Sequence, residues 1–224
     1  MAYFYFNQLY FNVDATAVLN HLKESAAEEG IELTPTDYRS EIGNRLLAIG
    51  RPRRDGGVTT FHFPTPRNLA WLSHSARQFV KLHNVVVLEL NYLEDYWSAI
   101  LWEGDAMLDH FSTLPHQQEL EPSDWELLKG NPELVARLCG VPLETVTPYY
   151  RWWQAPYDTW SELGTKSARA RKSRPPMLSG KAIEGDVYTY GQAGQVYDFS
   201  QRLGGCGHVD IGPEWSIFEC VRRQ

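Results

Sequence analysis

The sequence predicts an α+β fold in which an antiparallel sheet carries helices grouped on one face. Strand patterns and helix patterns come in runs and do not alternate strictly, as they would in a parallel α/β fold. Residues 84–112 contain three successive strand patterns joined by short turns, which predicts a three-stranded meander. With 224 residues and 43% apolar composition the chain can bury one core, so we expect a single domain over residues 1–224.

The first part of the chain has the patterns of a strand, a helix and two further strands. Residues 3–11 alternate loosely between aromatic and polar side chains, as a half-buried strand does. Asp14 stands at the N-cap position of an amphipathic helical pattern that ends at Gly30. The segments 45–50 and 57–63 read as strands on either side of a basic turn.

The central part predicts a long helix followed by the meander. Pro66 occupies the first helical position after a threonine cap, and the apolar spacing behind it predicts a helix over 66–82. The run of valines at 85–87 favours the first strand of the meander. Gly104 and Asp105 suit the central positions of a type II′ turn, which joins the second strand to the third.

The last part returns to helices and short strands around a basic segment. Residues 161–180 lose all periodicity, and the stretch from Lys166 to Arg174 contains basic side chains and no acidic one. We therefore expect a mobile basic loop at about 161–180. The other predicted elements are helices that begin near Ser123, Asn131 and Thr147, a strand over 187–190, a helix over 192–203 and a strand over 215–221.

Acidic side chains are concentrated in one region. Residues 84–145 hold twelve acidic and two basic side chains, a net charge of −10. On hairpins and loops such a region projects a negative potential that attracts cationic partners; a solvated face without a partner is the alternative interpretation. The acidic residues are Glu89, Glu94, Asp95, Glu103, Asp105, Asp109, Glu119, Glu121, Asp124, Glu126, Glu133 and Glu144.

A second concentration is aromatic. The cluster comprises Tyr149, Tyr150, Trp152, Trp153, Tyr157 and Trp160. One face of such a cluster packs in the core, while the excess could anchor an interface or stack sugars or bases. If it forms a binding surface, the three tryptophans Trp152, Trp153 and Trp160 are the expected contacts.

One short segment holds residue types that perform nucleophilic catalysis. Cys206, His208 and Asp210 occupy alternate positions, the order of a nucleophile, a base and an orienting acid. In an extended segment successive members would lie about 6 to 7 Å apart, too far for direct hydrogen bonds without a bend. A loop histidine beside a structural cysteine is the alternative interpretation of the segment.

Several functions are not indicated. No apolar stretch approaches the roughly 20 residues that span a bilayer, and the first residues lack the pattern of a secretory signal. Three cysteines cannot form a full disulfide framework, so we expect a cytoplasmic protein. We expect no metal and no cofactor, because neither metal-ligand spacings nor phosphate-binding glycine motifs occur. The net charge of −7 disfavours nucleic acid as a partner.

The favoured hypothesis is a cytoplasmic protein-binding module that presents its acidic face to a basic protein partner. The acidic contacts would be Glu94, Asp95, Glu103 and Asp105. By analogy of size, charge and fold class, the role resembles that of an immunity protein or inhibitor. The alternatives are a small-molecule enzyme with a pocket near Cys206, and a carbohydrate- or nucleotide-binding module that uses the aromatic cluster.

Overall fold

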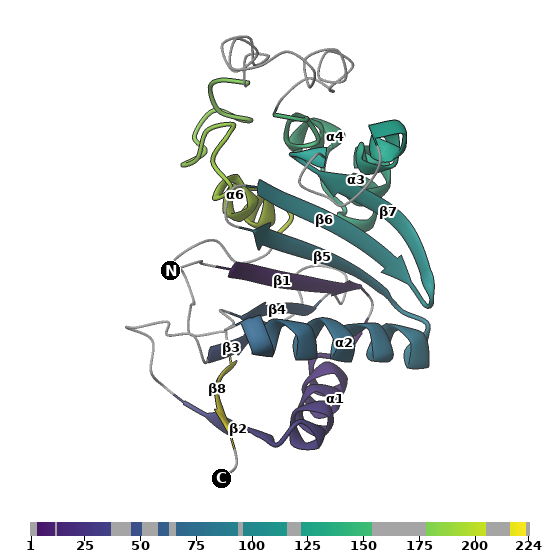
Figure 1. The fold of residues 1–224 in the computed structure, drawn as a ribbon, viewed down its shortest axis with the longest axis vertical. Helices are drawn as coiled ribbons and strands as arrows, with labels where there is room; N and C mark the ends of the chain where they lie inside the picture. Colours follow the sequence, from purple (N-terminus) through teal and green to yellow (C-terminus); the bar gives the residue numbers. More distant parts are fainter. Residues whose placement is uncertain are drawn as a thin grey trace, which may run out of the picture.

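The computed structural model describes residues 4–11, 13–36, 46–50, 58–62, 66–93, 96–115, 122–153, 178–204 and 216–222 (Figure 1). These residues form one antiparallel sheet with helices, which confirms the predicted α+β class. The predicted basic loop at 161–180 lies outside the described residues except at its end, residues 178–180.

Within the described residues the sheet has eight strands, in the order β2-β8-β3-β4-β1-β5-β6-β7. Every neighbouring pair in it is antiparallel. In Figure 1 it extends from β7 near the top of the molecule to β2 near the bottom. The strands are β1 (Phe4–Phe11), β2 (Ile31–Pro35), β3 (Leu46–Ile49), β4 (Val58–His62), β5 (Val86–Leu93), β6 (Tyr96–Glu103), β7 (Ala106–Ser112) and β8 (Ser216–Arg222).

The predicted meander is confirmed as β5, β6 and β7. Gly104, the first central residue of the turn, has a φ of 54°, whereas the φ of the second, Asp105, is not positive. A positive φ at the first central position followed by a negative one agrees with the predicted type II′ turn. The turn therefore follows from glycine standing at position 104.

Two long helices cover one face of the sheet. α1 (Ala15–Glu28) begins where predicted, because the Thr16 backbone N–H donates to Asp14 Oδ1 over 2.6 Å. α2 (Pro66–His83) agrees with the predicted helix over 66–82. Both helices share a core with Tyr10 of β1 and Val87 of β5, so the expectation of helices on one face holds for this pair.

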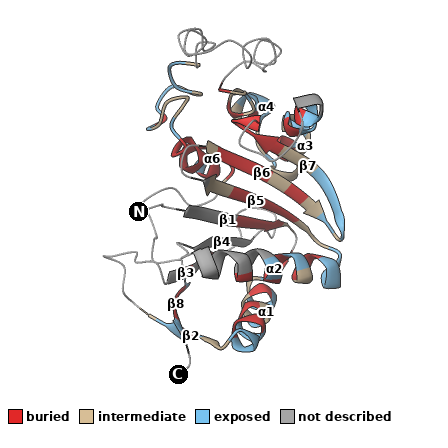
Figure 2. Cartoon of the chain, in the orientation of Figure 1, coloured by how far each residue is buried: buried red, intermediate tan, exposed pale blue. Residues whose placement is uncertain are grey.

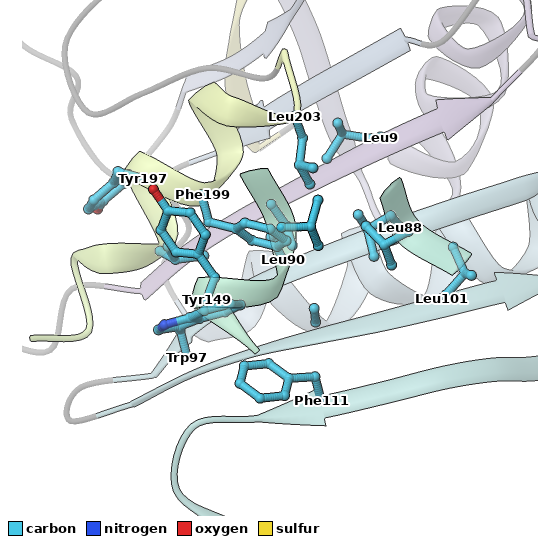
Figure 3. Close-up of a cluster of buried hydrophobic side chains, with 14 of the residues drawn as sticks. Leu9, Leu88, Leu90, Trp97, Leu101, Phe111, Tyr149, Tyr197, Phe199 and Leu203 are labelled. Atoms are coloured by element: carbon cyan, nitrogen blue, oxygen red, sulfur yellow. The ribbon is translucent and has the colours of Figure 1, made fainter. Parts of the chain in front are cut away.

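The shorter helices pack on the opposite face. Their core contains Leu9 of β1 and Leu88 of β5 (Figure 3). These residues directly adjoin Tyr10 and Val87 of the first core, and successive residues of a strand point to opposite faces of the sheet. Helices thus cover the sheet on both sides. The elements on this second side are η2 (Pro122–Leu128), α3 (Pro132–Cys139), α4 (Leu143–Val146), η3 (Thr147–Tyr149) and α6 (Gln195–Arg202).

Two segments differ from the sequence-based expectation. β2 directly follows α1 and was not expected; it pairs with β8. Residues 187–190 do not form the predicted strand and make a single bridge between Lys181 and Thr189. The backbone N–H groups of Val187 and Tyr188 instead donate to the Asp198 carboxylate, so they do not serve a strand partner.

Candidate binding surface

The tip of the β6–β7 hairpin carries two of the predicted binding residues. Glu103 ends β6 and Asp105 lies in the turn, and both are exposed. The Asp105 carboxylate pairs with Lys81 Nζ at 3.2 Å, which joins the tip to the last turn of α2. The other two predicted residues, Glu94 and Asp95, lie outside the described residues.

Further acidic side chains lie on the short helices beside β7. A bridge between Phe111 and Lys129 joins the end of η2 to β7, and the Asn131 backbone N–H donates to the Asp109 carboxyl group. Glu126 pairs with Lys129 at 2.6 Å. Four acidic residues are exposed on these elements: Asp124, Glu126, Glu133 and Glu144.

Glu89 does not belong to this exposed set. Its place in β5, two residues after Val87, directs its side chain into the core beneath α2, and it is 1% exposed. The expectation that Glu89 adds to an outward negative potential is therefore wrong. Glu89 is the only charged residue in the apolar run from Val85 to Leu90, and this pattern already indicated that its side chain could be buried.

The buried Glu89 is part of a hydrogen-bonded chain. Gln8 stands opposite it in β1 and donates from Nε2 to Glu89 Oε1 over 3.3 Å, while Trp102 Nε1 donates to Oε2 over 3.3 Å. The Tyr10 hydroxyl donates to Gln8 Oε1 over 2.8 Å. Burial raises the pKa of Glu89 to about 7, against the opposing effect of the Arg77 guanidinium.

β7 is an edge strand of the sheet and its first half is exposed. Met107 and Leu108 are 53% and 40% exposed, and the register shifts opposite them, between Leu101 and Trp102 of β6. Figure 2 shows this half of β7 and the neighbouring end of α2 as exposed. Leu82, at that end of α2, is 72% exposed. Apolar and acidic side chains are thus interspersed on this surface.

The described part of the aromatic cluster lies mainly in the core. Trp153 is fully buried, and its Nε1 donates to Gln195 Oε1 over 3.3 Å. A direct contact with a partner is therefore not available to Trp153. Trp152 is half-buried, and its Nε1 donates to the Leu128 carbonyl over 3.3 Å. Trp160 lies outside the described residues.

A second buried carboxylate network lies beside this core. Asp186 accepts hydrogen bonds from the Tyr149 hydroxyl at 2.7 Å and the Ile183 backbone N–H at 3.0 Å, and it pairs with Arg202 at 2.7 Å. These contacts tie the segment before α6 to both α6 and η3. No local pattern predicts the network, because Asp186 and Tyr149 are 37 positions apart.

The candidate catalytic residues Cys206, His208 and Asp210 lie outside the described residues, so the enzyme hypothesis stays a prediction. For the other two cysteines, Cys139 and Cys220, burial raises the pKa of the thiol to about 12. Among the described residues, no three side chains of the metal-binding types come together in one group.

No family model, curated protein or solved structure matches this chain. Within the described ranges, no helix combines the length and apolar character needed to span a membrane.

Proposed function

We propose that the protein is a binding module whose acidic end engages a basic protein partner. The acidic end comprises the β6–β7 hairpin tip and the helices η2, α3 and α4. The observation that carries the proposal is that Glu103, Glu133 and Glu144 are exposed there, and no basic side chain among the described residues forms an ion pair with them.

Part of the regional charge is already compensated. Asp105 and Glu126 have lysine partners, and Glu89 is buried. Glu103, Glu133 and Glu144 form no ion pair with the described basic side chains, so they can contribute to a negative field. A field of this kind raises the association rate of a cationic partner, and added salt weakens it.

The test uses two variants of equal charge. In the triple variant Glu103→Gln, Glu133→Gln and Glu144→Gln, three carboxylates of the acidic end are neutralised. The matched control is Glu24→Gln, Glu28→Gln and Glu29→Gln, which neutralises three exposed residues on or beside α1. Proteins from a host lysate are captured on each immobilised variant at 50 mM and 500 mM salt.

The proposal requires a basic protein that the wild type and the control retain at low salt and release at high salt. The variant with the neutralised acidic end should retain at least tenfold less of it. Equal capture by both triple variants, or capture that salt does not weaken, would show that the acidic end is not the binding site.

A further inference from the structure

The two edges of the sheet differ in how well they are protected. β2 is short, ends in Pro35 and exposes Glu32, features that discourage pairing with another strand. β7 contains neither proline nor lysine. Beyond its pairing with β6, the only bridge to β7 among the described residues joins Phe111 to Lys129, so the edge over residues 106–110 has no strand partner there.

The exposed apolar side chains distinguish this edge further. Seven large apolar residues are exposed in the described part of the chain, and three of them, Leu82, Met107 and Leu108, lie on β7 and the adjoining end of α2. The Lys81–Asp105 ion pair shows that the end of α2 lies beside the hairpin tip. The shift in register, a bulge, redirects side chains along β7, so that consecutive residues are exposed.

We infer that a basic, extended segment of the partner pairs with residues 106–110 of β7 as an added strand. This inference rests on the proposed function. An added strand takes its affinity from backbone hydrogen bonds and its specificity from alternate side chains. Met107 and Leu108 would contact its apolar side chains, while Glu103 at the hairpin tip would attract its lysines and arginines.

The charges select a basic segment over a second copy of this chain. A second copy paired along β7 would bring a surface with the same acidic side chains, Glu103, Asp105 and Asp109, to this edge. Like charges across neighbouring strands destabilise a pair, whereas lysine or arginine at those positions stabilises it.

The test is a selection from a library of ten-residue peptides with lysine or arginine at alternate positions and random residues between them. An enriched peptide is resynthesised with N-methyl groups at alternate backbone nitrogens, which removes hydrogen bonds and keeps the charge. We expect the N-methylated peptide to bind at least tenfold more weakly. We also expect the parent peptide to slow hydrogen exchange of the amides at 106–110.

A pair of protein variants separates strand pairing from simple attraction. The variant Met107→Asp with Leu108→Asp removes the apolar contacts and makes the surface more acidic. Strand pairing predicts at least tenfold weaker binding, whereas attraction to charge alone predicts equal or tighter binding. Val187→Asp is the control, because Val187 is 72% exposed in the segment before α6, outside β7 and η2. Circular dichroism spectra confirm that each variant is folded.

The outcomes distinguish this inference from the proposed function. If no peptide is enriched, or if N-methylation and the paired aspartates leave the affinity unchanged, the added strand is refuted. Lysate capture that still depends on the acidic end would then preserve the proposed function. If that capture also fails, both are refuted.

Discussion

The two faces of the sheet bury carboxylates in different ways. Beneath α2, Glu89 accepts two hydrogen bonds of 3.3 Å from uncharged side chains. On the other face, Asp186 accepts a backbone N–H and a tyrosine hydroxyl and pairs with Arg202 at 2.7 Å. The charge of Asp186 is thus matched by a charge in direct contact, whereas Glu89 relies on uncharged donors and a more distant arginine. Burial therefore raises the pKa of Glu89 to about 7.

Breaking the Asp186 network is expected to have one of the largest effects. Asp186→Ala would leave Arg202 and the Tyr149 hydroxyl without their shared acceptor. We expect the free energy of unfolding to fall by about 3 to 5 kcal/mol, because the Tyr149 hydroxyl and the Ile183 N–H lose their acceptor and Arg202 loses its charged partner. Urea denaturation measures the loss, with Glu103→Ala as the exposed control. A loss below about 1 kcal/mol would mean that this network is replaceable.

A matched pair of cavities tests whether both faces contribute equally to the core. Phe79 of α2 and Phe199 of α6 are both buried, and each contacts other aromatic rings. Phe79→Ala and Phe199→Ala should each destabilise the fold by about 3 to 5 kcal/mol. The two variants are compared by thermal and urea unfolding. A much smaller loss for either would show that its helix packs weakly on the sheet.

Glu89 should make stability depend on pH. Its pKa of about 7 lies above the ordinary 4.5, so the folded state binds the proton more tightly than the unfolded state. The stabilising contribution of the proton is complete below about pH 4.5 and is lost as pH rises through 7, in total roughly 3 kcal/mol. Glu89→Gln, which cannot ionise, should flatten this dependence. The free energies of unfolding of the wild type and of Glu89→Gln are measured by urea denaturation at pH 5 and pH 8. An equal change between the two pH values in both proteins would contradict the prediction.

The smallest effect is expected at the surface. Asp105→Asn removes the ion pair with Lys81, in which both side chains are well exposed. Exposed pairs contribute about 0 to 1 kcal/mol, so the urea midpoint should hardly move. If Asp105→Asn lowered the free energy of unfolding as much as Asp186→Ala, buried and exposed carboxylates would contribute equally to stability, contrary to the prediction.

Elements with strong local signals could be predicted from the sequence. Asp14 and Pro66 mark the starts of α1 and α2, and Gly104 marks the turn between β6 and β7. β2 could not be predicted, because five residues behind a helix become a strand only through pairing with β8. Its partner lies at the far end of the chain, where no local pattern reveals it.

The candidate surface could be predicted only in part. A hairpin tip exposes its polar residues, so the exposure of Glu103 and Asp105 follows from the turn alone. The lysine opposite Asp105 comes from α2 and depends on tertiary packing. Met107 is exposed because β7 is an edge strand, and the sequence does not reveal which strand lies at the edge unless the strand order of the whole sheet is known.

The position of β8 in the sheet affects how the chain folds during synthesis. β8 lies between β2 and β3, although it is the last strand along the sequence. In a nascent chain, β2 and β3 therefore each have an edge without a hydrogen-bonded strand until β8 has been synthesised and pairs with both. Such edges invite aggregation, so the time between the synthesis of β3 and that of β8 is the interval in which a chaperone would matter most.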